Sequence, residues 1–161
     1  MITLKTHFGV YGVCLKNNEL LCVKKNSGPY KKRFDLPGGS PEVAEGLTDT
    51  LVREFLEETG LSILRYSNNR VYDVFVHESG KEYMVHHIFA VYDVDLQTKK
   101  QAEIPREVVD GENDSNGSVW IEIDQLNSEN ASPLVLKLLE EIRQQDTVLE
   151  KSLFVDWQVL T

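Results

Sequence analysis

Residues 38 to 61 read GGSPEVAEGLTDTLVREFLEETGL and contain five glutamates, of which Glu54, Glu57 and Glu58 lie within five positions of one another. Leu47, Leu51 and Phe55 recur every four positions, which is the apolar stripe of an amphipathic helix. This helix is expected to begin at Leu47 and to stop just before Gly60, because glycine takes the left-handed conformation without steric cost. Like charges three or four positions apart on a helix repel each other, so the clustered glutamates need a physical explanation.

Glu54, Glu57 and Glu58 are expected on one side of the helix, because offsets of three and four positions share a face. Hard divalent cations bind oxygen ligands, and Mg²⁺ usually shares one or two carboxylates with the phosphates of a substrate. The cluster therefore predicts a site for such a cation. The alternative is a solvated helix face, since glutamate is a good helix former and a usual surface residue.

The spacing around the cluster resembles the box of the Nudix hydrolase family, G-x5-E-x7-R-E-U-x-E-E-x-G-U, where U is a bulky hydrophobic residue. The matching positions are Gly39, Glu45, Arg53, Glu54, Phe55, Glu57, Glu58, Gly60 and Leu61. Phe55 is the one departure, because the family usually has an aliphatic residue there. This departure concerns helix packing rather than chemistry.

The resemblance implies an α/β (α+β) fold, the Nudix-type α/β/α sandwich, with a mixed β-sheet between helices and the box at residues 39–61 as a loop-helix-loop. With 161 residues, 41% of them hydrophobic, the chain is expected to form a single domain over residues 1–161. Residues 146–161 are expected to dock onto this domain as a tail, as either helix or strand.

Alternation and turn residues predict the other elements. Asn17-Asn18 tolerates the positive φ of a tight hairpin turn, and Ser79-Gly80 is expected to link two longer strands into a second hairpin. A second helix is expected to start at Ser132 or Pro133. The predicted strands are 7–15, 19–25, 33–37, 69–78, 82–95 and 118–123.

The resemblance further implies a divalent-metal-dependent hydrolase that cleaves a phosphoanhydride bond in a nucleoside diphosphate linked to another group. Arg53 would orient the carboxylates through charge-assisted hydrogen bonds, and Glu45 would give structural support. The metal, Mg²⁺ or Mn²⁺, would neutralise the diphosphate and lower the pKa of the attacking water. Its ligands would be the carbonyl of Gly39 and the carboxylates of Glu54, Glu57 and Glu58.

Two places are candidates for the general base. Glu54 in the box is the first choice, and Glu112, in the loop before Trp120, is the second, with Glu107 and Asp114 behind it. As loop acids, the last three have a simpler alternative, which is that they are solvated.

Substrate contacts are expected from the segment just before the box. Lys32 and Arg33, beside Lys31, lie close enough in sequence to reach a phosphate, and Phe34 could stack on a base. The alternatives are a solvated basic loop and a core aromatic residue. His86 and His87 point to opposite faces of a strand, so at most one faces any site, and neither is expected to be catalytic.

Missing signatures narrow the substrate class. The arginine-containing extension of coenzyme A enzymes and the SQPWPFP-like run of NADH enzymes are absent, and no proline lies between Pro41 and Pro105, where ADP-ribose enzymes commonly carry one. Elimination favours a nucleoside or deoxynucleoside triphosphate, including an oxidised one, cleaved to the monophosphate and pyrophosphate. The alternatives are an ADP-ribose or nucleotide-sugar pyrophosphatase, and a Nudix-fold module that senses a nucleotide without cleaving it.

Composition bounds location and partners. The net charge of −9 argues against nucleic acids and anionic membranes as partners, and leaves a small nucleotide as the expected one. No charged leader and no run of 18 apolar residues is present, so a cytoplasmic location is expected. Cys14 and Cys22 are expected to be reduced thiols. Phe154 and Trp157 would suit a homodimer contact as well as a lid.

Overall fold

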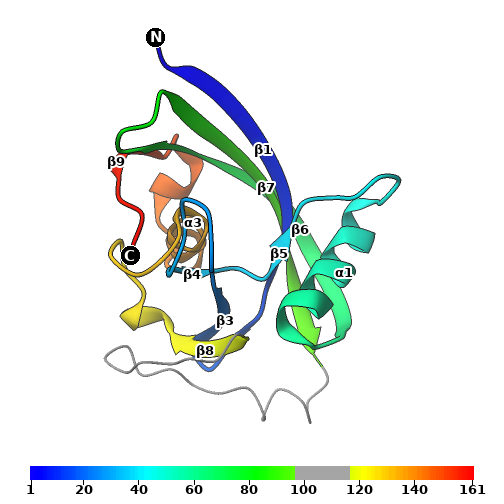
Figure 1. The fold of residues 1–161 in the computed structure, drawn as a ribbon. Helices are drawn as coiled ribbons and strands as arrows, with labels where there is room; N and C mark the ends of the chain where they lie inside the picture. Colours follow the sequence, from blue (N-terminus) through cyan, green and yellow to red (C-terminus); the bar gives the residue numbers. More distant parts are fainter. Residues whose placement is uncertain (97–116) are drawn as a thin grey trace.

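The computed structural model describes residues 1–96 and 117–161, which form two sheets and two α-helices (Figure 1). The strands are β1 (Thr3–Val13), β2 (Leu15–Lys16), β3 (Glu19–Lys24), β4 (Phe34–Asp35), β5 (Gly38–Gly39), β6 (Ile63–Glu78), β7 (Tyr83–Leu96), β8 (Ser118–Glu122) and β9 (Leu153–Trp157). The helices are α1 (Leu47–Thr59) and α3 (Pro133–Ile142), with 3₁₀ turns η1 (Ile123–Gln125) and η2 (Asp146–Leu149).

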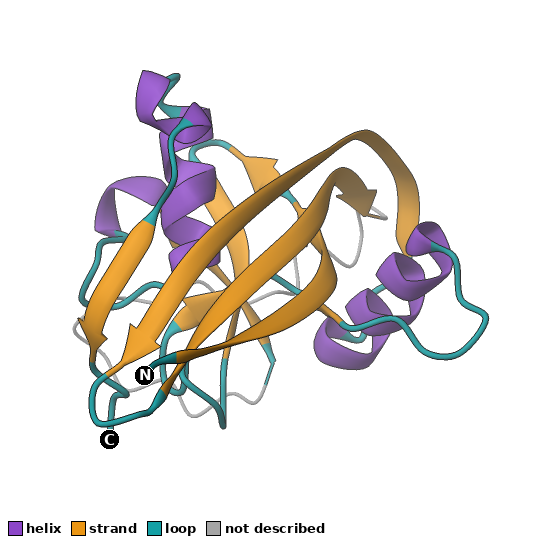
Figure 2. Ribbon diagram, turned by 90° about the horizontal axis from the view of Figure 1, so that it is seen from above, coloured by secondary structure: helices purple, strands orange, loops and turns teal. Residues whose placement is uncertain are grey.

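The larger sheet is mixed and has the strand order β5-β1-β7-β6-β9. β1 runs parallel to β7, β6 runs antiparallel to β7, and β9 runs parallel to β6. The long strands β1, β6 and β7 curve together across the molecule (Figure 2). The predicted hairpin of residues 69–78 and 82–95 is confirmed, although β6 begins earlier, at Ile63.

The smaller sheet forms around β3, which pairs with β2, β4 and β8. Asn17 and Asn18 have φ angles of 51° and 64°, so they form the predicted tight turn between β2 and β3. The pairing of β3 with β8 brings Leu21 opposite Trp120. Strand β8 therefore closes the smaller sheet with a segment from late in the chain.

Helix α1 spans the predicted residues and ends at Gly60, whose φ is 72°. Leu51 and Phe55 are fully buried, but Leu47 in the first turn is exposed. Thr50 is buried instead, and its hydroxyl donates to the carbonyl of Gly46. The apolar stripe is thus shorter than the sequence predicted.

Two apolar cores lie on opposite faces of the mixed sheet, under α1 on one side and under α3 on the other (Figure 1). This layering confirms the predicted α/β/α arrangement. Cys14 and Cys22 are both buried, one in each core. Among the described residues, no helix is both long and apolar enough to cross a membrane.

The tail contains both kinds of structure, the turn η2 and then the strand β9. Trp157 is buried in the core of its own chain, and its indole N–H donates to the carbonyl of Pro29 at 2.8 Å. The start of α3 is also as predicted, because Ser132 caps it by accepting from the backbone N–H of Val135. Trp157 thus joins the tail to the segment that precedes the box.

Candidate active site

The backbone of the loop formed by residues 38–46 lies close to the acidic face of α1. Strand β5 pairs with β1 at Val10 and Tyr11, which fixes Gly38 and Gly39 in place. A Cβ added to Gly39 would lie 2.6 Å from the carboxyl carbon of Glu54. Only glycine lets the loop approach this carboxylate so closely.

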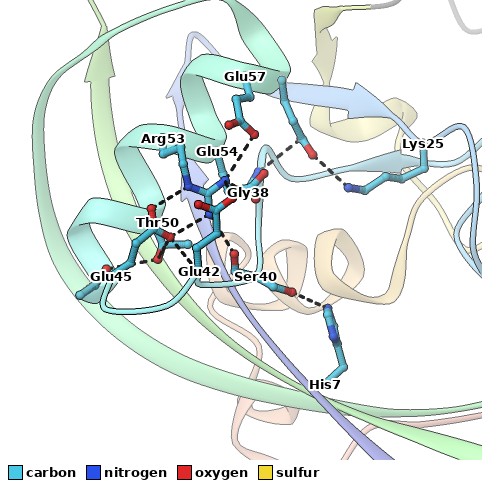
Figure 3. Close-up of polar contacts among 12 residues, drawn as sticks. His7, Lys25, Gly38, Ser40, Glu42, Glu45, Thr50, Arg53, Glu54 and Glu57 are labelled. Atoms are coloured by element: carbon cyan, nitrogen blue, oxygen red, sulfur yellow. Dashed lines mark hydrogen bonds and ion pairs between the residues drawn. The ribbon is translucent and has the colours of Figure 1, made fainter.

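Arg53 organises the acidic side chains around it (Figure 3). It binds both carboxylate oxygens of Glu45, through Nε at 2.7 Å and Nη2 at 2.8 Å. Its Nη1 donates to Glu54 at 2.9 Å and to Glu57 at 3.3 Å, while Nη2 also donates to the carbonyl of Ser40 at 3.0 Å. One guanidinium therefore holds two of the expected metal ligands on the same side of the helix.

The contacts with Arg53 strongly lower the pKa of Glu45. Hydrogen bonds from Arg53, and then from the backbone N–H of Glu42 and the hydroxyl of Thr50, lower the pKa of Glu45 to about 2. The same contact with Glu45 is the main cause of the raised pKa of Arg53. Both groups stay charged at neutral pH, as a fixed support for the site.

Glu58 faces a different cation. Its Oε1 lies 3.2 Å from Nζ of Lys25, and its Oε2 accepts from the backbone N–H of Gly38 at 3.3 Å. Burial raises the pKa of Glu58, and these two contacts offset the rise only in part. Burial alone would lower the pKa of Lys25, but the carboxylates of Asp35 and Glu58 outweigh it and raise the value.

Asp35 is a buried acid that the sequence did not indicate. Its Oδ2 lies 3.9 Å from Nζ of Lys25, and its Oδ1 accepts from the hydroxyl of Ser132 at 2.6 Å. Burial raises the pKa of Asp35, against the opposing effects of Lys25 and Ser132. Lys25 therefore lies between two carboxylates from distant parts of the chain.

The donor set suits a hard divalent cation. Glu54, Glu57 and Glu58 offer carboxylate oxygens from one helix, and Gly39 brings its backbone against Glu54. As the side chains stand, no three His, Cys, Asp or Glu residues in the described part of the chain converge closely enough to hold a metal ion. Arg53 and Lys25 hold these carboxylates instead, so a metal would have to replace those contacts.

A cleft of about 510 Å³ adjoins the carboxylates, and Lys25 stands in its lining. His87 is buried in its wall between two tyrosines, with Nε2 3.1 Å from the hydroxyl of Tyr11 and Nδ1 3.2 Å from that of Tyr30. Burial, and then the charges of His7 and Lys25, lower the pKa of His87 to about 3, so this ring is neutral. The other lining residues are Lys5, Thr6, His7, Ser27, Pro29, Asp35, Tyr83 and Val85.

Arg33 and Phe34, which the sequence placed among the substrate contacts, lie elsewhere. Arg33 is buried, stacks 4.0 Å from the centre of the Trp157 ring, and donates to backbone carbonyls such as that of Ser128. Phe34 is buried in the core, and Lys32 is exposed with a φ of 62°. None of the three lines the cleft, so this geometry does not favour their predicted role.

The remaining predicted acids and histidines are placed as follows. Glu112, Glu107 and Asp114 lie outside the described residues. His86 is on the opposite face of β7 from His87, where it contacts Asp73 at 2.6 Å. Alternation along the strand indicated these opposite faces, but it gave no sign that His87 would meet Tyr11 and Tyr30.

The family follows from a comparison with known proteins. Residues 4–142 match the NUDIX domain. The chain belongs to the Nudix family. A MutT NUDIX hydrolase from Burkholderia pseudomallei has the same fold, with a TM-score of 0.63 and 19% identity over 86% of this chain and 98% of that one. Shewanella oneidensis NrtR, solved also with a 27mer DNA, matches with a TM-score of 0.61 and 16% identity over 88% of this Nudix chain and 64% of its own.

One relative with an assigned activity is similar over a shorter stretch. An ADP-ribose pyrophosphatase of Methanocaldococcus jannaschii is 44% identical over 52 residues, which are 32% of this Nudix chain and 31% of that protein. The similarity thus covers less than a third of the relative. The activity of this relative enters below, as part of the proposed function.

Proposed function

We propose that the protein is a divalent-metal-dependent hydrolase that cleaves a phosphoanhydride bond in a nucleoside diphosphate linked to another group. The observation that carries this proposal is the acidic face of α1, where Arg53 gathers Glu54 and Glu57 beside the Gly39 backbone. Glu58 extends this face toward the cleft through its contact with Lys25. A diphosphate at the acidic face would leave room in the cleft for the rest of the substrate.

Glu54, Glu57 and Glu58, with the carbonyl of Gly39, would hold Mg²⁺ or Mn²⁺. When bound, the metal would neutralise the diphosphate and make the attacking water more acidic. Glu54 is the proposed general base, because Arg53 fixes its carboxylate at 2.9 Å and the Gly39 loop packs against it. Arg53 keeps its position through the two bonds to Glu45.

Two substrate classes follow from different observations. A nucleoside or deoxynucleoside triphosphate, including an oxidised one, follows from the missing signatures of other classes. ADP-ribose, with nucleotide sugars as the next choice, is favoured by the Methanocaldococcus jannaschii relative named as an ADP-ribose pyrophosphatase. The aromatic lining of the cleft, with Tyr11, Tyr30 and Tyr83, suits the flat base that both classes share.

The test is a substrate panel of nucleoside triphosphates, oxidised nucleotides, ADP-ribose, nucleotide sugars and dinucleotides, each with Mg²⁺ and then with EDTA. Products identify the class, because a triphosphate yields the monophosphate and pyrophosphate, whereas ADP-ribose yields AMP and ribose 5-phosphate. Cleavage that EDTA abolishes would support the proposal. Metal-dependent binding without any cleavage would support a nucleotide-sensing module instead.

The same proposal includes a small nucleotide as partner, no nucleic acid or membrane, and a cytoplasmic location. The net charge of −9 supports the absence of a nucleic-acid or membrane partner, although the fold neighbour NrtR was solved with DNA. A homodimer stays open, but Trp157 is not available for its contact because the residue is buried within its own chain. Size-exclusion chromatography with light scattering would measure the oligomeric state.

A further inference from the structure

Lys25 is the only lysine or arginine in the cleft lining that also contacts an expected metal ligand, among the residues that the structure describes. Its backbone is fixed just after β3: its N–H donates to the carbonyl of Arg33 at 3.2 Å, and its carbonyl accepts from Lys32 at 2.7 Å. The side chain is partly exposed, at 28%. The backbone of Lys25 is therefore fixed, while its ammonium lies at the end of a flexible four-carbon stem.

Two carboxylates share this one ammonium. Glu58 lies at 3.2 Å and Asp35 at 3.9 Å, and the Asp35 side chain is 1% exposed. With Glu54 also nearby, the group carries excess negative charge that Lys25 offsets only in part. Lys25 thus occupies the position where an incoming divalent cation would compete for Glu58.

A metal on Glu58 and the ammonium of Lys25 would repel each other, because both are cations. Asp35 would remain beside Lys25 as a second anion if a metal bound the carboxylate of Glu58. Lys25 also lines the cleft, where an anionic group of a bound ligand would be a further partner for its ammonium. Lysine binds phosphate well as a compact point charge on a flexible stem.

We propose that Lys25 is an exchangeable internal cation: it neutralises Glu58 in the metal-free protein, and it binds a phosphate group of the substrate once a divalent metal takes Glu58. This inference rests on the proposed function and names a phosphate-binding residue outside the box. In this exchange the negative charge of Glu58 is paired with a cation both without the metal, by Lys25, and with it, by the metal. It also links metal binding to substrate binding through one side chain.

The test uses Lys25→Met and two binding measurements by titration calorimetry. With Mn²⁺ alone, the variant should bind the metal about threefold more tightly or better, because a competing ion pair has been removed. With inorganic pyrophosphate at saturating Mn²⁺, the same variant should bind about tenfold more weakly or worse, because a charge-assisted bond is lost. The two changes have opposite signs, which a general loss of folding would not produce.

Lys5→Met is the matched control, since it removes the same charge from the lining of the same cleft. The ammonium of Lys5 lies 3.8 Å from the centre of the Tyr83 ring. Lys25→Arg keeps the charge and should restore pyrophosphate binding, and circular dichroism would show that each variant is folded. Equal Mn²⁺ affinity in Lys25→Met and Lys5→Met would overturn the inference alone. Failure of the unmodified protein to bind Mn²⁺ would overturn the proposed function as well.

Discussion

Arg53 offsets the repulsion between two of the three clustered glutamates, Glu54 and Glu57, while Lys25 contacts the third, Glu58. The planar guanidinium of Arg53 contacts three carboxylates and one backbone carbonyl at once, at distances from 2.7 to 3.3 Å. Lysine could not reproduce this fork, because an ammonium is a point charge without fixed planar geometry. A residue of the same helix therefore offsets the repulsion between Glu54 and Glu57.

Glu57 is the expected ligand whose removal should separate activity from stability. Its side chain is 58% exposed, and its contact with Arg53 is long, at 3.3 Å. Glu57→Gln should lower metal-dependent turnover by at least about tenfold, by analogy with the loss of supporting groups at metal sites. The melting temperature should stay within about 2 °C of the original.

Turnover of the best panel substrate and a thermal melt would measure both quantities. Glu129→Gln, at an exposed glutamate far from α1 in sequence, is the control and should change neither. Full Mg²⁺-dependent turnover in Glu57→Gln would remove this residue from the ligand set.

The pairing of Glu45 with Arg53 should make the free energy of unfolding fall as the pH becomes acidic. The pKa of Glu45 is lowered to about 2, mainly by Arg53, whereas the pKa of a glutamate in an unfolded chain is about 4.3. The stabilisation from this pair is therefore complete above the unfolded pKa and is lost as the pH falls toward the folded value. Glu45→Gln should flatten the loss of stability between about pH 4.5 and pH 2.

Urea unfolding at several pH values across this window would measure the difference between Glu45→Gln and the original protein. The gap between them should be largest near neutral pH and should close as the pH falls. A gap of constant size across the window would contradict the assigned pairing.

At the level of elements, the site depends on how closely the β5 loop approaches α1. Strand β5 is held by β1, while Leu51 and Phe55 anchor the helix in the core on the same face of the mixed sheet. Two independent anchors thus set the distance between the Gly39 backbone and Glu54. The loop and the helix form a rigid frame in which the carboxylates are the adjustable parts.

Gly39→Ala tests this frame. The new Cβ would meet the end of the Glu54 side chain at 2.6–2.8 Å, and a flexible carboxylate is able to move away. We expect little loss of stability but a fall in turnover of about a hundredfold, which a displacement of 1 Å or so of a catalytic group is able to cause. Steady-state kinetics and a thermal melt would measure the two effects.

Gly117→Ala is the control for the glycine-to-alanine change, because no atom of the described residues lies within 4 Å of a Cβ at that position. It should alter neither turnover nor stability. Unchanged turnover in Gly39→Ala would show that the close approach of loop and helix does not position Glu54.

At the scale of the whole molecule, the C-terminal strand supports one wall of the cleft. Trp157 bonds to the carbonyl of Pro29 and covers Arg33, whose Nε is buried without a hydrogen-bond partner among the described residues. Trp157→Ala should lower the free energy of unfolding by about 3–5 kcal/mol, as for other large buried aromatic residues. It should also raise KM, because Pro29 and Tyr30 line the cleft.

Val155→Ala is the control in the same strand, and it should change the free energy of unfolding by less than about 0.5 kcal/mol because Val155 is exposed. Urea unfolding would measure both variants. A Trp157→Ala protein as stable as Val155→Ala would show that β9 does not brace the cleft.

Local signals in the sequence predicted the parts of the fold that local physics decides. The period of Leu51 and Phe55, the stop at Gly60 and the Asn17-Asn18 turn each act over a few residues, and the structure contains all three features. The box spacing also predicted which acids share a helix face. Such features need no knowledge of the rest of the chain.

The missed residues owe their roles to contacts across long separations. Asp35 meets Ser132 at a separation of 97 residues, and Lys25 meets Glu58 at a separation of 33. Arg33 looked like a phosphate ligand because it follows two lysines, yet the docking of β9 buries it. No local pattern reports which strand a distant segment will join.

The contact between Trp157 and Pro29 also has a consequence for the order in which the protein matures on the ribosome. Translation delivers residues from the N-terminus onward, at about 5–20 per second. The acidic helix would be synthesised several seconds before Trp157 is added. During that time the cleft lining at Pro29 would lack its hydrogen bond from Trp157. Nucleotide capture should therefore be a late event in biogenesis, and stalled chains that end before β9 should be preferred targets of proteases.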